Sequence, residues 1–98
     1  MMTEKQLQTY VVQLAKLLGY RVYHTWLSAR SAPGFPDLVL LKDGQLWFIE
    51  LKSATGKLSP HQEAWIEELY AVPGVLVNVW RPEHWLSGEI AGRLQQGC

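Results

Sequence analysis

The sequence predicts an α/β fold in which a mixed β-sheet is flanked by helices and the core elements follow the order αβββαβ. Apolar residues recur at helical spacing in segments 3–19 and 59–71, and segments 20–27, 37–41, 45–52 and 75–80 have the composition of strands. A turn signal joins the second and third strands, and a helix separates the third from the fourth, as a parallel pair requires. A chain of 98 residues has room for one small core, so we expect a single domain over residues 1–98.

The first helix is expected to begin after Thr3, because Thr3 and Gln6 have the spacing of a capping box. Gly19 is a typical helix-ending residue. The apolar stripe between them consists of Leu7, Val11, Leu14 and Leu18, widened by Tyr10, Ala15 and Leu17.

Three strands are expected next. Segment 20–27 is aromatic and β-branched, and segment 28–36 is a loop of small residues with Gly34 and two prolines. Segment 37–41 is apolar after its first residue and predicts a buried strand. Asp43 and Gly44 form a strong hairpin turn signal, so segment 45–52 is expected to be the returning strand.

The second helix is predicted from Ser59, because Ser59 as N-cap, Pro60 at the first position and Gln62 at the third are all typical of a helix start. We expect this helix to end before Pro73 and Gly74. Segment 75–80 is then the last strand, and one or two short helices are expected from residue 82 onward.

The hairpin turn predicts which side chains face each other. If Asp43 and Gly44 form a two-residue turn, the same register that sets Lys42 opposite Gln45 sets Asp37 opposite Glu50. Cβ atoms of facing residues lie roughly 4.5–5.5 Å apart. Strand alternation then places Lys52 on the same side as Glu50. Two carboxylates and an ammonium group are therefore expected at one end of an otherwise apolar hairpin.

This trio favours metal-assisted chemistry on a phosphodiester. Facing carboxylates repel each other, and a bound Mg²⁺, which prefers oxygen ligands and often takes only one or two carboxylates, would relieve the repulsion. A metal ion can polarise a phosphoryl oxygen and activate water, and a nearby ammonium can stabilise the developing charge. The alternative is a structural ion cluster at a sheet edge.

Two motifs make the chain resemble a known nuclease superfamily. Gly34, Pro36 and Asp37, followed by Glu50 and Lys52, resemble the PD-(D/E)XK signature. The segment LSPHQ at 58–62, followed by Trp65 and Leu69, looks like the VRR-NUC branch of that superfamily, in its stand-alone viral or prophage form. The resemblance implies a restriction-endonuclease-like fold.

The resemblance also implies a role for each matching residue. Asp37 and Glu50 would be metal ligands, the backbone carbonyl of Leu51 a third ligand, and Lys52 the catalytic lysine. The implied cofactor is Mg²⁺ or Mn²⁺, and no organic cofactor is expected.

Two further site residues have structural alternatives. Gln62 matches the family's glutamine near the metal or the substrate phosphate, but it also completes a capping box. Glu4 lies on the apolar side of the first helix, and in this superfamily such a glutamate often reaches the metal through water. Alternatively, Glu4 complements the helix dipole.

Three residues outside this set are candidates for contacts with nucleic acid. Arg30 and Lys57 lie in loops that flank the motif strands, and His61 lies in the first turn of the second helix. For the two cations, a solvent-exposed charge without a function is the alternative. His24 has no partner at the spacing of a zinc site.

The overall charge limits the mode of DNA binding. The formal net charge is zero, which excludes a strongly basic DNA-coating protein. Residues 1–57 carry +3 and residues 58–98 carry −3. The chain has five tryptophans, a surplus that indicates an oligomer interface or a surface for stacking bases.

These observations, together with the resemblance, predict a metal-dependent, structure-specific DNA endonuclease that resolves four-way (Holliday) junctions as a homodimer. The alternatives are a flap or nicking nuclease with another DNA shape preference, and a non-catalytic DNA-binding module on the same fold.

The expected location is the cytoplasm, in a bacterial host if the protein is viral or prophage-encoded. The start of the chain lacks the apolar centre of a secretory signal, and no apolar run approaches the ~20 residues of a membrane helix. The lone Cys98 has no partner for an internal disulfide, and no membrane association is expected.

Overall fold

The computed structural model describes residues 1–25 and 32–97 and confirms the predicted order of elements. Two short helices follow the last strand. The elements are α1 (Glu4–Leu17), β1 (Arg21–His24), β2 (Leu38–Lys42), β3 (Gln45–Leu51), α2 (Pro60–Tyr70), β4 (Val75–Trp80), α3 (Pro82–Leu86) and α4 (Glu89–Gln96).

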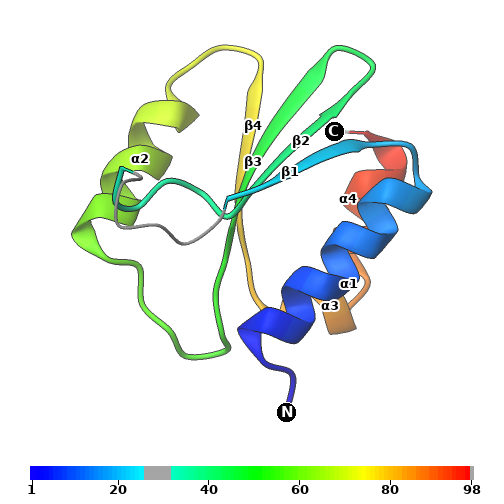
Figure 1. Ribbon diagram of the computed structural model, residues 1–98, viewed down its shortest axis with the longest axis horizontal. Helices are drawn as coiled ribbons and strands as arrows, with labels where there is room; N and C mark the ends of the chain where they lie inside the picture. Colours follow the sequence, from blue (N-terminus) through cyan, green and yellow to red (C-terminus); the bar gives the residue numbers. More distant parts are fainter. Residues whose placement is uncertain (26–31, 98) are drawn as a thin grey trace.

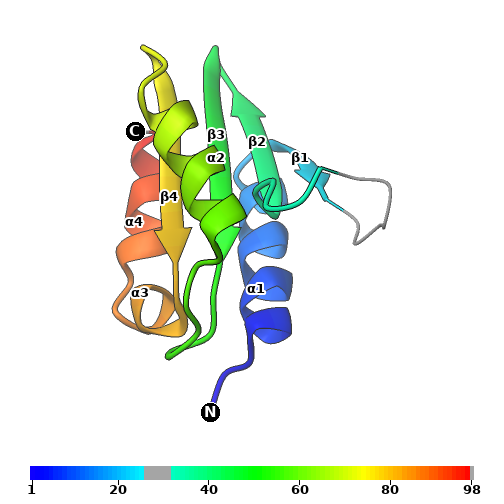
Figure 2. The same cartoon turned by 90° about the vertical axis from the view of Figure 1, so that its left-hand side faces the viewer.

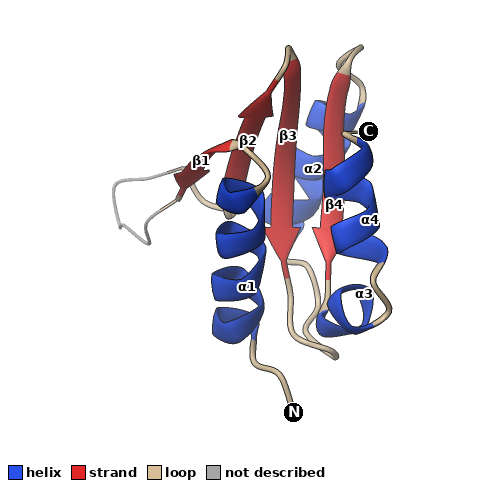
Figure 3. Cartoon of the chain, turned by 90° about the vertical axis from the view of Figure 1, so that its right-hand side faces the viewer, coloured by secondary structure: helices blue, strands red, loops and turns tan. Residues whose placement is uncertain are grey.

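The four strands form one mixed sheet in the order β1-β2-β3-β4. β1, β2 and β3 pair antiparallel, and β4 pairs parallel to β3 after the α2 crossover. α2 covers one face of the sheet, whereas α1, α3 and α4 cover the other (Figures 1 and 2). The N-terminal end of α1 lies at the same end of the sheet as the C-terminal end of β3 (Figure 3). The fold class inferred from the sequence is therefore correct.

The β2–β3 hairpin has the predicted register. Lys42 pairs with Gln45, and the ladder continues to Leu38 opposite Ile49. Asp43 and Gly44 both have positive φ, at 50° and 78°, as a type I′ turn requires. The ladder ends one pair before Asp37, so the prediction that the strand begins at residue 37 is wrong by one position.

The first strand is shorter than predicted. β1 covers Arg21–His24 rather than segment 20–27, and residues 26 and 27 lie outside the described ranges. Tyr20 belongs instead to the core, where its hydroxyl donates to the Leu94 carbonyl oxygen at 2.7 Å. The backbone N–H of Tyr20 donates to the Ala15 carbonyl oxygen of α1 at 2.9 Å, so it does not take part in the strand ladder.

The core lies between the sheet and the α1/α4 layer. Its largest members are Trp47 and Trp80, and α1 contributes Leu7, Val11 and Ala15. The apolar stripe of α1 is narrower than predicted, because Leu17 is 83% exposed and Tyr10 is partly exposed and stacks on Trp85. None of the helices in the described ranges is both long and apolar enough to span a membrane.

Gly34 allows the loop before β2 to lie against the start of α2. Its φ is +85°, and a Cβ atom there would lie 2.4 Å from the backbone carbon of His61. Phe35 packs edge-on against Trp65 of α2, with ring centroids 5.0 Å apart, and the Trp65 indole donates to the Pro33 carbonyl at 3.1 Å. This contact holds the residues before Asp37 against the helix that carries Gln62.

The substitution Gly34→Ala is expected to destabilise the fold by about 2–4 kcal/mol, because left-handed backbone strain adds to a steric clash with α2. Gly74→Ala is the matched control, since Gly74 has φ +81° but no atom within 4 Å of a Cβ. The control substitution is expected to lower the free energy of unfolding by only about 1–2 kcal/mol. Urea unfolding of both variants measures the difference, and equal losses would contradict the contact.

Candidate active site

Glu50 is a buried carboxylate near the end of β3. It is 2% exposed and is the only buried charged residue in the described ranges. Gln62 Nε2 donates to Glu50 Oε2 at 3.0 Å. Glu50 Oε1 is also buried but has no hydrogen-bond partner among the described residues. Because an unpaired buried carboxylate oxygen is costly, this atom is the strongest indication that the site binds a ligand.

Asp37 lies beside Glu50, just before β2 begins. Its Oδ2 accepts a hydrogen bond from the backbone N–H of Leu51 at 2.8 Å. The regular ladder has ended here, so the Asp37 side chain takes the place of a backbone acceptor on the β2 side. The two carboxylates are therefore brought together as the hairpin register predicts, although Asp37 lies just outside the strand.

The proximity of Asp37 changes the pKa of Glu50. Burial, followed by the charge of Asp37 and a hydrogen bond with it, raises the pKa of Glu50 to about 8. Lys52 opposes this rise and Glu4 adds to it. Without a bound cation, Glu50 therefore retains a proton at neutral pH.

Lys52 and Glu4 contribute opposite charges to this end of the sheet. The Lys52 N–H donates to the Trp80 carbonyl at 3.0 Å, which fixes its backbone beside β4. Glu4 is exposed as a whole residue, but partial burial of its carboxyl group, followed by the charge of Asp37, raises its pKa, and Lys52 lowers it. The structure thus brings Glu4 into the electrostatic field of the trio.

The backbone carbonyl of Leu51 is available next to the two carboxylates. In a strand, the N–H and C=O of one residue point to the same side, so this carbonyl faces the β2 side, like the N–H bonded to Asp37. Continuing the register beyond Leu38 and Ile49 sets Pro36 opposite Leu51. Proline has no N–H to donate. The proline of the motif therefore leaves an oxygen ligand unpaired by its facing residue.

Gln62 completes the capping box and also contacts a predicted metal ligand, Glu50. Its Oε1 accepts from the Ser59 N–H at 2.9 Å and completes the capping box of α2. Its Nε2 simultaneously donates to Glu50. The start of α2 is therefore connected directly to the buried carboxylate.

The oxygen donors fit a hard divalent cation. Two carboxylates and one carbonyl, completed by water, suit Mg²⁺, which seldom uses an all-protein cage. In residues 1–25 and 32–97, no group of three or more His, Cys, Asp and Glu side chains is arranged to hold a metal ion. A water-mediated role for Glu4 therefore stays a prediction.

Two of the three predicted nucleic-acid contacts lie in the described residues. His61 is exposed in the first turn of α2, and Lys57 is exposed in the preceding loop. Arg30 lies outside the described residues. His24 is joined to Gln8, with their Nε2 atoms 2.7 Å apart.

Arg81 is a site-supporting residue that the sequence did not indicate. Its Nη1 donates to the carbonyls of Ser53 and Gly56 at 2.8 and 2.7 Å. These bonds hold the loop that follows Lys52 against the end of β4. An arginine directly after the last strand is the only sequence signal, and it does not reveal this loop as the partner.

The fold and the site define an α/β domain with an acidic, metal-compatible centre at the end of a hairpin. The sequence model of the VRR-NUC domain matches residues 1–81, and the chain therefore belongs to the VRR-NUC family. VRR-NUC is a nuclease-type domain, and nucleic acid is accordingly the substrate class that membership implies.

Solved structures agree with this assignment. One, described as a VRR-NUC domain, has 25% sequence identity and a TM-score of 0.69, and the match covers 96% of this chain and 97% of that one. A second, described as a VRR-NUC domain protein, has 22% identity and a TM-score of 0.69, covers 93% and 84%, and shows the shared fold. No functionally curated protein matches the chain.

The raised pKa of Glu50 predicts a pH-dependent stability in chelator. A carboxyl group whose pKa is higher in the folded than in the unfolded state stabilises the fold fully below its ordinary pKa of 4.5, and this contribution is lost as pH rises through about 8. Glu50→Gln removes the charge, so at pH 8 the variant is expected to be more stable than the wild type by roughly 1–3 kcal/mol.

Urea unfolding between pH 5 and pH 9 tests this prediction, with the exposed Glu67→Gln as control. Added Mg²⁺ should raise the stability of the wild type and of the control at pH 8, but it should not raise that of Glu50→Gln. Parallel pH profiles for wild type and Glu50→Gln would refute the assignment of the proton to Glu50.

Proposed function

We propose that this protein is a metal-dependent endodeoxyribonuclease that hydrolyses phosphodiester bonds at the Asp37–Glu50–Lys52 centre. The observation that carries the proposal is Glu50 Oε1, a buried oxygen without a described partner beside a second carboxylate. Asp37, Glu50 and the Leu51 carbonyl would hold Mg²⁺ or Mn²⁺. A non-catalytic DNA-binding module would have no need for this costly arrangement.

Each residue has a distinct task in the proposed reaction. When bound, the cation supplies Lewis-acid polarisation of the scissile phosphate and neutralises the two carboxylates. Gln62 holds the Glu50 carboxylate in place through its amide N–H. The Lys52 ammonium orients the attacking water and stabilises the negative charge that develops on the phosphate. Arg81 keeps the loop after Lys52 in position.

Cleavage assays with Mg²⁺ or Mn²⁺ and with chelator test the centre. Asp37→Asn, Glu50→Gln and Lys52→Met are each expected to lower the rate of DNA cleavage by at least about 100-fold, the scale of losing one preorganised electrostatic group. Cleavage that persists at the wild-type rate in any of these variants would rule out the proposed site.

The two capping boxes provide a matched pair for Gln62. Gln6 caps α1 in the same way but makes no described contact with a carboxylate, so Gln6→Ala reports the loss of a cap alone. We expect a loss of stability of about 0.5–1 kcal/mol for Gln6→Ala and a larger loss for Gln62→Ala, which also leaves buried Glu50 Oε2 without its donor. Only Gln62→Ala should also reduce cleavage, by about tenfold or more.

We propose further that two copies act together on branched DNA, with a four-way junction as the preferred substrate. The neutral net charge gives little general affinity for duplex DNA, which favours recognition of a shaped substrate by two subunits. Exposed apolar residues support self-association: Tyr23 and Leu41 are 59% and 45% exposed, and strand alternation puts them on the sheet face away from the buried Leu40.

Sedimentation and a comparison of DNA shapes test this second proposal. A dimer at micromolar concentration and symmetric nicks in a four-way junction are expected. A monomer would count against the dimer. Equal cutting of junction, flap, single-stranded and plain duplex DNA would refute the junction preference but not the nuclease activity. Preferential cutting of flaps or nicking of duplex would favour the flap or nicking alternative.

A further inference from the structure

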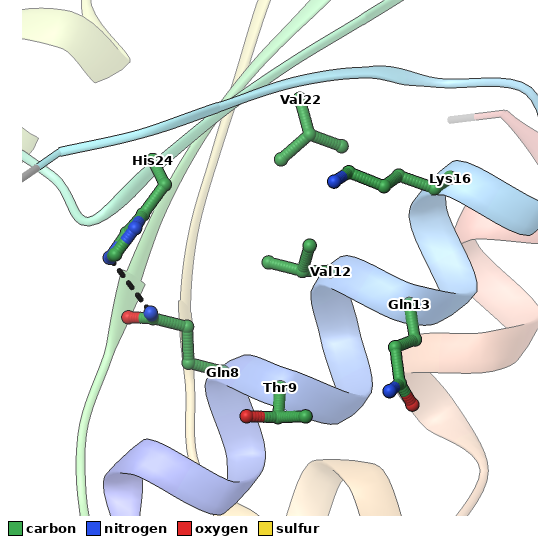
Figure 4. A pocket seen from close by; sticks show the side chains of 7 residues that line it. All are labelled: Gln8, Thr9, Val12, Gln13, Lys16, Val22 and His24. Carbon is green, nitrogen blue, oxygen red and sulfur yellow. Dashed lines mark hydrogen bonds between the residues drawn. The ribbon is translucent and has the colours of Figure 1, made fainter.

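A groove of about 370 Å³ lies between α1 and the edge strand β1, on the sheet face opposite α2. Gln8 and His24 lie at one end of it and Lys16 at the other, with Val12 and Val22 facing each other between them (Figure 4). Thr9 and Gln13 complete the lining. The groove therefore has an apolar floor and a rim of hydrogen-bonding groups.

The charge around this groove favours a polyanion. Its lining contains the cation Lys16 and no carboxylate. The described cations of α1 and β1 are Lys5, Lys16 and Arg21, of which Lys16 lines the groove. The opposite face carries exposed glutamates on α2, namely Glu63, Glu67 and Glu68. The Lys16 ammonium, with no carboxylate in the lining, therefore favours a negatively charged strand in the groove itself.

The groove lies on the α1 side of the sheet, whereas Glu50 contacts Gln62 of α2 on the other side, so the link between groove and site runs around the end of the sheet at Glu4 and Asp37. Gln8 lies one helical turn after Glu4, on the same side of α1. His24 directly precedes Thr25, whose N–H donates to the Asp37 carbonyl at 2.8 Å. Gln8 is therefore one helical turn from Glu4, and His24 is next to a residue that is hydrogen-bonded to Asp37. Lys16 lies at the other end of the groove, farther from these site residues.

We propose that this α1–β1 groove binds the sugar–phosphate backbone of the DNA strand that flanks the scissile phosphate. This inference rests on the proposed nuclease function and adds the path of the substrate. Lys16 pairs with a phosphate, the amides of Gln8 and Gln13 donate to phosphate oxygens, and Val12 and Val22 contact the sugars. From Glu4 to Lys16 the helix rises about 18 Å, a length that extends over several phosphates of one strand.

The salt dependence of DNA binding tests the proposed phosphate contact. A fluorescein-labelled four-way junction is titrated in chelator, which blocks the proposed metal-dependent cleavage, at several salt concentrations. Lys16→Gln is expected to lower the slope of log Kd against log salt by about 1, as loss of one phosphate contact does. Lys16→Arg retains the charge and should retain the slope.

Arg21→Gln is the matched control, because Arg21 is an exposed cation on β1 that does not line the groove. Its slope should equal that of the wild type. In cleavage assays, Lys16→Gln should raise KM with little change in kcat, since the contact lies away from the reacting phosphate.

Shortened substrates locate the groove along the strand. When the cleaved strand is cut back to two nucleotides on the side held by the groove, Lys16→Gln should bind no more weakly than the wild type. Shortening the other side should leave the effect of Lys16→Gln intact.

The outcomes separate this inference from the proposed function. An unchanged salt slope for Lys16→Gln, together with normal metal-dependent cleavage, would refute DNA binding in the groove and leave the proposed nuclease function intact. Equal slope changes for Lys16→Gln and Arg21→Gln would also overturn it, because they would show a general charge effect. An absence of both DNA binding and cleavage in the wild type would overturn the groove and the proposed function together.

Discussion

The close approach of Asp37 and Glu50 at the open end of the β2–β3 hairpin is the constraint to which the surrounding structure is adapted. Burial and mutual repulsion disfavour ionisation of both carboxylates, and the raised pKa of Glu50 expresses this cost. A fold that needed only stability would place apolar side chains at these positions, as it does along the rest of the hairpin. The unfavourable charge arrangement is therefore best explained by a ligand that neutralises it.

Hydrogen bonds from three separate parts of the chain hold the local structure around this pair in place. The Leu51 N–H fixes Asp37, the Gln62 amide fixes Glu50, and Arg81 fixes the loop beyond Lys52. Gln62 depends in turn on the close packing of the loop at Gly34 against the first turn of α2. Stability and site geometry are consequently coupled, because the same groups that begin a helix or end a strand also orient the carboxylates.

The charges of the neutral chain are distributed unevenly among its elements. The α2 face carries exposed glutamates, whereas α1 and β1 carry cations and no acidic residue after Glu4. Zero net charge therefore does not mean the absence of a basic surface. In the proposed function, the cations of α1 would contact the nucleic acid while the neutral net charge limits indiscriminate attraction to duplex.

Local rules in the sequence determined much of the fold. Capping boxes, the Asp43-Gly44 turn and strand alternation act over a few residues, and they predicted both main helices, the hairpin register and the juxtaposition of Asp37, Glu50 and Lys52. The tertiary structure decided what depends on distant segments meeting: the second bond of Gln62, the loop held by Arg81, the position of Tyr20 in the core, and the groove between α1 and β1. Spacing along the chain fixes side-chain direction within one element, but contacts between elements depend on how the layers pack, and no local pattern encodes that.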